Sequence, residues 1–273
     1  MSYKSVLVNI DIDGPVAPIV KAASDLAARL QARLIGLCVA DAPMPIIMPD
    51  GAALAGEAWQ QMRNDIESRF KDVRASFAKS AGSSAETEWR DVLDNPTRGL
   101  TEAARAADLV VMGAAEGADS GDLYRSADPG SVVLQAGRPV LVVAKGADHV
   151  PVKKAVIGWK DTREARRAVA DAVPLLACAE KVTIVTVAEE VGPWIREGVA
   201  DVAAFLSRHG IEAGSEMIES SAESRKLAEF ISSSGADLVV TGAYGHSRLR
   251  QWAFGGVTRS LLDETGLHRF MSC

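Results

Sequence analysis

The sequence has few of the residues that mark a secreted, membrane-bound or nucleic-acid-binding protein. Only three cysteines, Cys38, Cys178 and Cys273, occur among 273 residues, and their wide spacing argues against a disulfide framework. We expect all three to be reduced, with Cys38 and Cys178 packed in or beside a sheet as small apolar residues. No apolar run approaches the roughly 18 residues of a membrane span, and the amino terminus lacks a leader pattern, so we expect a cytoplasmic chain with no membrane partner.

Positive charge and catalytic motifs are also scarce. The formal net charge of −6 argues against a nucleic-acid partner, because phosphate contacts need clustered Lys and Arg. The chain lacks a G-x-x-x-x-G-K-(S/T) loop, a G-x-G-x-x-G loop after a predicted first strand, a His-x-Gly-His pair and a Ser/His/Asp set with a structural context. His246 has no second His, Cys or acid at ligand spacing. We therefore expect no catalytic residue and no metal site.

One stretch of the chain occurs twice. Residues 107–114 read Ala-Asp-Leu-Val-Val-Met-Gly-Ala, and residues 236–243 read Ala-Asp-Leu-Val-Val-Thr-Gly-Ala. Such a match indicates two copies of one unit, and 273 residues suit two domains of about 135 each. The segment 145–151 has the polar, Gly and Pro character of a linker. We place the boundary near residue 148, which predicts domains of residues 1–148 and 149–273.

Each copy alternates short β-branched strands with helices, as expected for parallel strands covered on both faces. Strands are predicted at residues 6–10, 33–39, 87–91, 109–112 and 139–143, and then at 155–159, 182–187, 212–218, 238–241 and 267–272. Helices are predicted at residues 16–31, 57–79, 96–106, 163–176, 194–209, 224–233 and 257–263. The predicted fold is α/β, with two tandem five-stranded, doubly wound, Rossmann-like parallel sheets packed as a pseudo-twofold pair.

Two segments break the regularity of this pattern. The first copy holds about 20 extra residues between its second and fourth strands, and residues 42–51 contain three prolines that oppose regular structure. This insertion is either a lid or partner-binding loop, or a cover for its own sheet edge. The last predicted strand carries His268 and Arg269, which suggest an edge that is protected from pairing.

The loops after the fourth strand of each copy differ in glycine spacing and charge. In open parallel sheets, ligands collect at the carboxyl ends of strands, and helix amino termini there favour anions. Gly242 and Gly245 are followed by nine residues and then by Gly255-Gly256-Val257-Thr258. Residues 243–254 carry a formal charge of +2, whereas residues 114–129 of the first copy carry −3. The second loop suits a phosphate, although the same glycines also suit an ordinary strand-to-helix turn.

The doubled strand order, the repeated Ala-Asp-Leu-Val-Val run, the first strand at residues 5–11 and the stretch 242–250 together resemble the tandem universal stress protein family over essentially the whole chain. The resemblance implies binding of ATP or AMP, ATP with or without Mg²⁺, through G-x-x-G, nine residues and then G-(S/T). Gly242, Gly245 and Gly255 match this pattern directly. Gly256 stands where Ser or Thr is usual, and Thr258 offers a hydroxyl two residues later.

The resemblance also assigns roles to the strand ends. Nucleotide-binding members of the family end their first strand in an acidic residue, and Asp11 matches this pattern. The repeat partner of Asp11 is Lys160. Either Lys160 reaches a phosphate and Asp161 takes part of the acid's role, or Lys160 is a solvated lysine. The residues implied for the second copy are Lys160, Asp161, Val187, Gly242, Gly245, His246, Ser247, Arg248, Gly255, Gly256, Val257 and Thr258. The first-copy equivalents are Asp11, Gly113, Gly130 and Ser131, which we expect to form a degenerate, structural copy.

Three functions remain in competition at this point. The first is a non-catalytic, stress-response protein whose second copy binds an adenine nucleotide and whose association with itself or with an unknown protein depends on that nucleotide. The second is an interaction or dimerisation module in which both nucleotide sites have decayed, as Gly256 and Lys160 suggest. The third is a slow ATPase, because a site that neutralises phosphates can assist an in-line water. The sequence leaves monomer and homodimer open.

Overall fold

The structure of the chain is a computed structural model that describes residues 2–43, 52–83, 85–114, 122–243, 261 and 266–273. The first half contains β1 (Ser5–Asn9), α1 (Val16–Leu30), β2 (Arg33–Ala40), α2 (Ala52–Ala81), β3 (Thr87–Leu93), α3 (Pro96–Ala103), β4 (Leu109–Gly113), α4 (Pro129–Gln135) and β5 (Val140–Val143). The second half contains β6 (Lys154–Gly158), α5 (Arg163–Leu176), β7 (Lys181–Ala188), α6 (Pro193–Arg208), β8 (Ala213–Glu219), α7 (Glu223–Ser234), β9 (Leu238–Gly242) and β10 (His268–Ser272). The predicted α/β class is confirmed.

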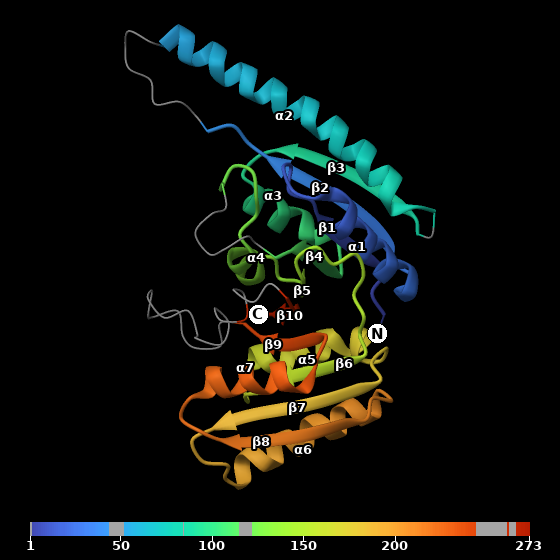
Figure 1. Cartoon of the computed structure of the whole chain (residues 1–273), viewed down its shortest axis with the longest axis vertical. Helices are drawn as coiled ribbons and strands as arrows, with labels where there is room; N and C mark the ends of the chain where they lie inside the picture. Colours follow the sequence, from blue (N-terminus) through green and yellow to red (C-terminus); the bar gives the residue numbers. More distant parts are fainter. Residues whose placement is uncertain (1, 44–51, 84, 115–121, 244–260, 262–265) are drawn as a thin grey trace.

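All ten strands form one continuous sheet, in the order β3-β2-β1-β4-β5-β10-β9-β6-β7-β8 (Figure 1). Strands are parallel within each half, and the halves meet where β10 pairs antiparallel with β5, with Phe270 opposite Leu141. The second half therefore repeats the strand order of the first in mirror order about this β5–β10 seam. Such a pairing is what a pseudo-twofold arrangement of two five-stranded units requires.

Helices cover both faces of the sheet. On one face, α1, α2, α5 and α6 pack over a single large core that runs through both halves. On the other face, a second core lies beneath α3, α4 and α7. Helix α2 begins earlier than predicted, and in Figure 1 its first turns extend beyond the sheet. Along the described part of the chain, no helix has both the length and the apolar character needed to span a bilayer.

The aspartate of the repeated Ala-Asp-Leu run has a structural role in both halves. The carboxylate of Asp108 accepts hydrogen bonds from the backbone N–H groups of Lys4 and Ser5, at 2.8 and 3.0 Å. In the second half, Asp237 accepts from the backbone N–H groups of Lys153 and Lys154, at 3.0 to 3.2 Å. Each aspartate thus ties the start of its fourth strand to the start of its first. The aspartate end of each repeated run therefore lies at the amino ends of the strands, and its glycine end, Gly113 or Gly242, lies at the carboxyl end.

The last strand corrects one prediction from the sequence. Residues 267–272 looked like a protected edge, but β10 lies between β5 and β9 near the middle of the sheet, and His268 and Arg269 are 6% and 0% exposed. The error arose because these polar residues are buried by the other half of the chain, which the local pattern does not reveal. The Arg269 guanidinium donates to the carbonyl oxygen of Leu261 at 2.9 Å.

The structure confirms the prediction for Cys38 and contradicts the prediction for Cys178. Cys38 is buried in β2, and burial raises the pKa of its thiol to about 12, so it is confirmed as a core residue. Cys178 is exposed, which is contrary to the prediction. It follows the end of α5, and its backbone N–H bonds back to Leu175, so the turn carries its side chain away from the sheet. Cys273 is partly exposed.

Candidate functional site

The carboxyl ends of β6, β7 and β9 lie side by side in the second half. Gly158 pairs with Thr241 of β9 on one side and with Val185 of β7 on the other. This register brings together the predicted residues Lys160, Val187 and Gly242, each of which lies within two residues of the end of one of these strands. Because parallel strands end at the same edge, their loops define one candidate binding edge.

Both charged residues at this edge have partners. The ammonium of Lys160 lies 2.9 Å from the carboxylate of Glu223, at the start of α7. Asp161 lies 3.2 Å from the guanidinium of Arg166, one turn into α5. The cation expected at a phosphate is therefore paired with an acid in this structure. A ligand phosphate would have to compete with Glu223 for Lys160.

Gly242 and its repeat partner Gly113 have different surroundings. A Cβ atom added at Gly242 would lie 2.4 Å from the backbone nitrogen of Ala165, at the start of α5. A Cβ atom at Gly113 would meet no atom of the described residues within 4 Å. Glycine at 242 is therefore required for the close approach of β9 to the amino terminus of α5, so the strand-to-helix interpretation applies to this residue.

The remaining predicted residues lie outside the described part of the chain. They are Gly245, His246, Ser247, Arg248, Gly255, Gly256, Val257 and Thr258. The helix predicted at residues 257–263 falls there too, apart from Leu261, as does most of the insertion at residues 42–51.

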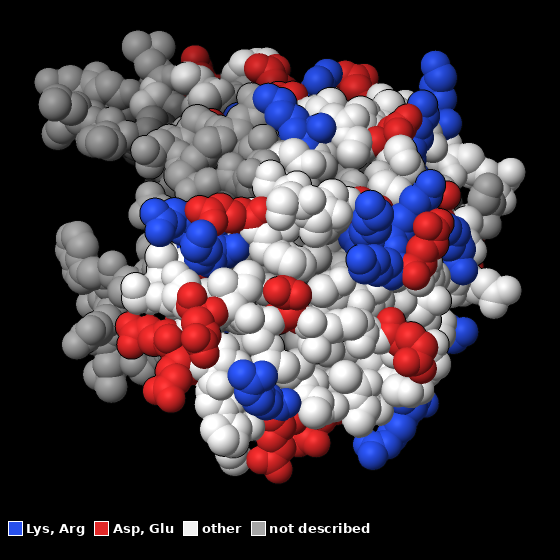
Figure 2. All heavy atoms as spheres, turned by 60° about the horizontal axis from the view of Figure 1, so that its bottom comes forward, with Lys and Arg blue, Asp and Glu red and all other residues white. Residues whose placement is uncertain are grey.

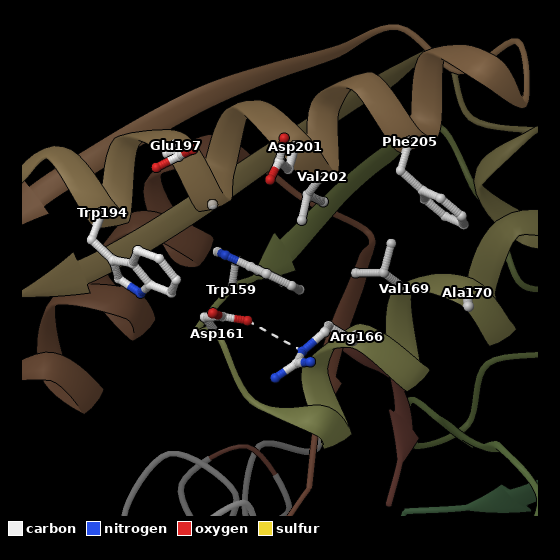
Figure 3. Close-up of a pocket in the computed structure, with 11 residues that line it drawn as sticks. Trp159, Asp161, Arg166, Val169, Ala170, Trp194, Glu197, Asp201, Val202 and Phe205 are labelled. Atoms are coloured by element: carbon white, nitrogen blue, oxygen red, sulfur yellow. Dashed lines mark ion pairs between the residues drawn. The ribbon is translucent and has the colours of Figure 1, made fainter.

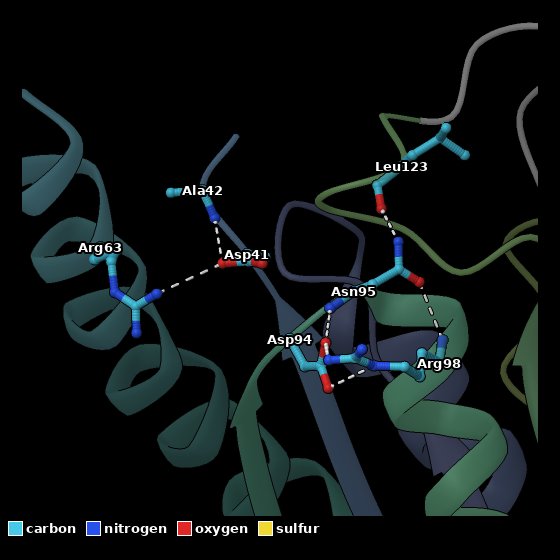
Figure 4. A network of polar contacts seen from close by, with 7 residues as sticks. All are labelled: Asp41, Ala42, Arg63, Asp94, Asn95, Arg98 and Leu123. Atoms are coloured by element: carbon cyan, nitrogen blue, oxygen red, sulfur yellow. Dashed lines mark hydrogen bonds and ion pairs between the residues drawn. The ribbon is translucent and has the colours of Figure 1, made fainter. Parts of the chain in front are cut away.

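In the first half, a segment of the chain itself occupies the carboxyl ends of the strands. This segment, residues 123–128, follows β4 and leads into α4. The carbonyl oxygen of Leu123 accepts from the Asn95 side chain at 3.2 Å, and that of Tyr124 accepts from the backbone N–H of Asp41, directly after β2, at 2.8 Å. Figure 4 shows Leu123 beside Asn95 and Asp94, where β3 leads into α3.

The charged residues of the 123–128 segment are also bound to this edge. Arg125 forms a two-pronged ion pair with Asp13, which follows β1. The Arg125 guanidinium lowers the pKa of the Asp13 carboxyl below its ordinary value. Asp128 caps α4, because its carboxylate accepts from the backbone N–H of Ser131 at 2.7 Å. An internal carboxylate thus takes the helix-start donor that a phosphate would use.

Asp11, the acid implied by the resemblance, belongs to the same network. Its carboxyl accepts from the Asn9 side chain at 3.0 Å and is also held by the backbone of Ala127. Burial raises the pKa of Asp11, with a smaller contribution from the nearby charge of Asp13. Gly113 and Gly130–Ser131 flank this edge, at the end of β4 and the start of α4. Apart from the net negative charge of residues 114–129, no local pattern in the sequence indicates that residues 123–128 fold back over these positions.

The surface carries charges of both signs. On the face shown in Figure 2, Lys and Arg alternate with Asp and Glu over the described residues, and no continuous basic area is visible. Such a surface does not present the single-sign field that draws nucleic acid to a protein.

The mostly parallel sheet with helices on both faces defines a doubly wound, Rossmann-like α/β fold. The model of the Universal stress protein family matches residues 2–144, which is more than half of the chain. The chain therefore belongs to the universal stress protein family.

Solved structures agree with this fold along the whole chain. A universal stress protein from Archaeoglobus fulgidus superposes with a TM-score of 0.75 at 12% identity, covering 98% of this chain and 97% of that one. A putative universal stress protein from Pseudomonas aeruginosa gives 0.62 at 14% identity, covering 99% and 93%. A universal stress protein solved in complex with cAMP is 25% identical over 52% of this chain and 98% of that one, with a TM-score of 0.36. No curated protein matches the chain in sequence.

Proposed function

We propose that the chain consists of two universal stress protein domains, residues 1–148 and 149–273, and that the second binds an adenine nucleotide, ATP or AMP. The observation that carries this proposal is the meeting of Lys160, Val187 and Gly242 at the ends of three neighbouring strands. The family contains a member that has been solved with cAMP. The protein acts without catalysis, and nucleotide binding alters its association with itself or with another protein.

The first domain supports this division by its own contacts. The backbone N–H groups at its strand ends already have partners. The N–H after β2 donates to the carbonyl oxygen of Tyr124, and an N–H at the start of α4 donates to the carboxylate of Asp128. In the second domain, Glu189 is the repeat partner of Asp41, and no described residue accepts a hydrogen bond from its backbone N–H. Among the described residues, the edge of the second domain therefore has a backbone donor without a partner, where the first domain has the Tyr124 carbonyl.

Calorimetric titration of ATP and AMP into the purified chain tests the proposal. We expect one nucleotide per chain, and we expect Gly245→Asp to abolish binding because it places a carboxylate in the glycine loop. Ser131→Ala, in the first domain, is the matched control and leaves binding unchanged. The proposal is contradicted if no binding is measured at millimolar nucleotide. It is also contradicted if the wild-type chain binds two nucleotides and Ser131→Ala binds one.

The pairing of Lys160 with Glu223 favours a second candidate, a module whose nucleotide site has decayed. Glu223→Gln separates the two candidates. If Lys160 serves a phosphate, removal of its competitor strengthens ATP binding by roughly fivefold, which corresponds to about 1 kcal/mol of binding free energy. The double variant Lys160→Met/Glu223→Gln loses that gain. If ATP binding is unmeasurable in both the wild-type protein and Glu223→Gln, the decayed-site function is correct.

A further inference from the structure

A groove lies between α5 and α6 on the outer face of the second half. Its volume is about 430 Å³. Apolar side chains from both helices line it, among them Val169, Val202 and Phe205, and the Trp159 indole, from the end of β6, forms its floor (Figure 3). The groove shares Asp161 with the residues assigned to the nucleotide site, whereas Lys160, Val187 and Gly242 are not part of its lining.

The helices that border the groove pack differently from their counterparts in the first half. There α1 and α2 pack along one another, whereas the groove separates α5 from α6. At the repeat position of Trp159, the first half has Ile10, which is 1% exposed. The larger indole therefore forms a broad aromatic floor, and the small Ala170 and Gly198 leave space above it.

The floor of the groove has a polar atom without a partner. Trp159 is only 6% exposed, and its indole N–H donates to no described residue. A Cβ atom added at Gly198 of α6 would lie 3.9 Å from the indole nitrogen. In Figure 3 this nitrogen edge of Trp159 is directed along the groove toward Trp194. The N–H group is therefore open to the groove, and an occupant that offers an acceptor can form a hydrogen bond with it.

The rim of the groove is negatively charged. Glu197 and Asp201 lie one turn apart on α6, and neither carboxylate forms an ion pair or hydrogen bond with any residue that the structure describes. Asp161 is already balanced by Arg166, at 3.2 Å. The lining therefore carries two uncompensated negative charges beside apolar surface. An anion is repelled there, and a cation is favoured.

A large aromatic side chain completes the rim. Trp194 is 72% exposed at the start of α6, and its ring points toward the Trp159 indole (Figure 3). Together with Phe205, these rings offer faces that attract a cation. Aromatic rings and carboxylates are the groups that recognise an organic ammonium ion, and the indole N–H can donate to an acceptor on the same molecule.

We propose that this groove binds a small organic ammonium ion that has an apolar body and one hydrogen-bond acceptor. The ammonium lies between Glu197 and Asp201, the apolar body lies on Trp159 and against Trp194, and the acceptor takes the indole N–H of Trp159. This site shares only Asp161 with the proposed nucleotide site, and it differs from it because it opens between α5 and α6 and selects the opposite charge.

Four compounds of similar shape test the charge and the acceptor separately, by calorimetry and tryptophan fluorescence on the full chain. The first, 2-phenoxyethylammonium, has both features and is expected to bind and to change the emission of Trp194. In 3-phenylpropylammonium a methylene replaces the acceptor oxygen, which we expect to weaken binding severalfold. The neutral 2-phenoxyethanol is expected to bind roughly tenfold more weakly, and the anionic phenoxyacetate is expected not to bind.

Variants locate the site and provide the control. We expect the double variant Glu197→Gln/Asp201→Asn and the single variant Trp194→Ala each to lower the affinity for 2-phenoxyethylammonium by roughly tenfold. Both change exposed side chains, so the fold is retained. Glu180→Gln removes an exposed carboxylate outside the groove and leaves binding unchanged. The proposal is overturned if 2-phenoxyethylammonium and 2-phenoxyethanol bind equally well, or if Glu197→Gln/Asp201→Asn leaves binding unchanged. It is also overturned if ATP displaces the bound ammonium compound. Because ATP binding is measured independently, failure here leaves the proposed nucleotide function standing.

Discussion

At the scale of single residues, the two repeated glycines make the sharpest comparison. Gly242→Ala places a Cβ atom within 2.4 Å of the Ala165 backbone, which cannot rotate away, so we expect the free energy of unfolding to fall by about 1 to 3 kcal/mol. Gly113→Ala is the matched control, because that position is open, and its effect is expected to stay within about 0.5 kcal/mol. Urea denaturation measures both. Equal losses in the two variants would contradict the packing role of Gly242.

The same pair of glycines shows what the sequence can and cannot reveal. Spacing placed both at strand ends, which is correct. It could not show that one touches a helix and the other does not, because that depends on how closely α5 approaches β9. Lys160 is similar: its position at the strand end was predictable, but its partner Glu223 lies 63 residues away.

At the scale of elements, the seam strand β10 predicts a pH dependence of folding. The side chain of His268 is 6% exposed, and its Nδ1 accepts from the backbone N–H of Ala144 at 3.2 Å. Burial lowers the pKa of His268 from 6.5 to about 4, helped by the charges of His149 and Arg269. The folded state therefore favours the neutral ring. The stability that this ring supplies is complete above pH 6.5 and is lost as the pH falls toward 4.

The loss corresponds to about 3 kcal/mol, at about 1.4 kcal/mol for each pKa unit. We expect His268→Asn, which keeps an acceptor near the Nδ1 position, to remove that part of the pH dependence between pH 6.5 and 4. His209→Asn, on an exposed histidine after α6, is the control. Denaturant unfolding at several pH values measures the slopes. A slope unchanged in His268→Asn would show that protonation of this residue does not weaken the seam.

Most elements were predictable from the sequence, and the exceptions have a common cause. Helix α5 spans the predicted residues, and strands such as β1, β4 and β6 lie within a residue of the predicted bounds. Apolar β-branched runs are sufficient evidence for strands buried on both faces. The strand at β10 was predicted, but its place in the middle of the sheet and the fold-back of the 123–128 segment were not. Each depends on contacts with residues more than 20 positions away, and local pattern carries no such information.

At the scale of the whole molecule, the two halves are held together by much more than the connecting segment. Beyond the β5–β10 pairing, Arg29 donates to the carbonyl oxygen of Val150 at 2.7 Å, and Arg167 donates to that of Gly137 at 3.2 Å. The hydroxyl of Tyr3 also donates to the backbone of Asp171 in α5. One apolar core runs beneath both halves on the face of α1, α2, α5 and α6.

We therefore expect the halves to remain associated after the chain is cut. A protease site introduced at the exposed residues Lys145 and Gly146 allows this cut without disturbing the sheet. The two fragments are expected to elute together from a size-exclusion column, at the volume of the uncut chain. Elution as two half-sized species would show that the seam and the other contacts between the halves do not hold the fragments together. The uncut variant, treated with inactive protease, is the control.

The 123–128 segment has a consequence for any competition at the first-half strand ends. A covalently attached occupant has a fixed effective concentration, on the order of millimolar for a short flexible tether, however dilute the protein becomes. A nucleotide that binds this edge as tightly as the segment does has to exceed that concentration before it displaces Tyr124 and Asp128. A nucleotide that binds more weakly has to exceed it by the ratio of the two affinities. Dilution of a nucleotide lowers the occupancy of the proposed second-half site, but dilution of the protein does not remove the 123–128 segment from the first-half edge.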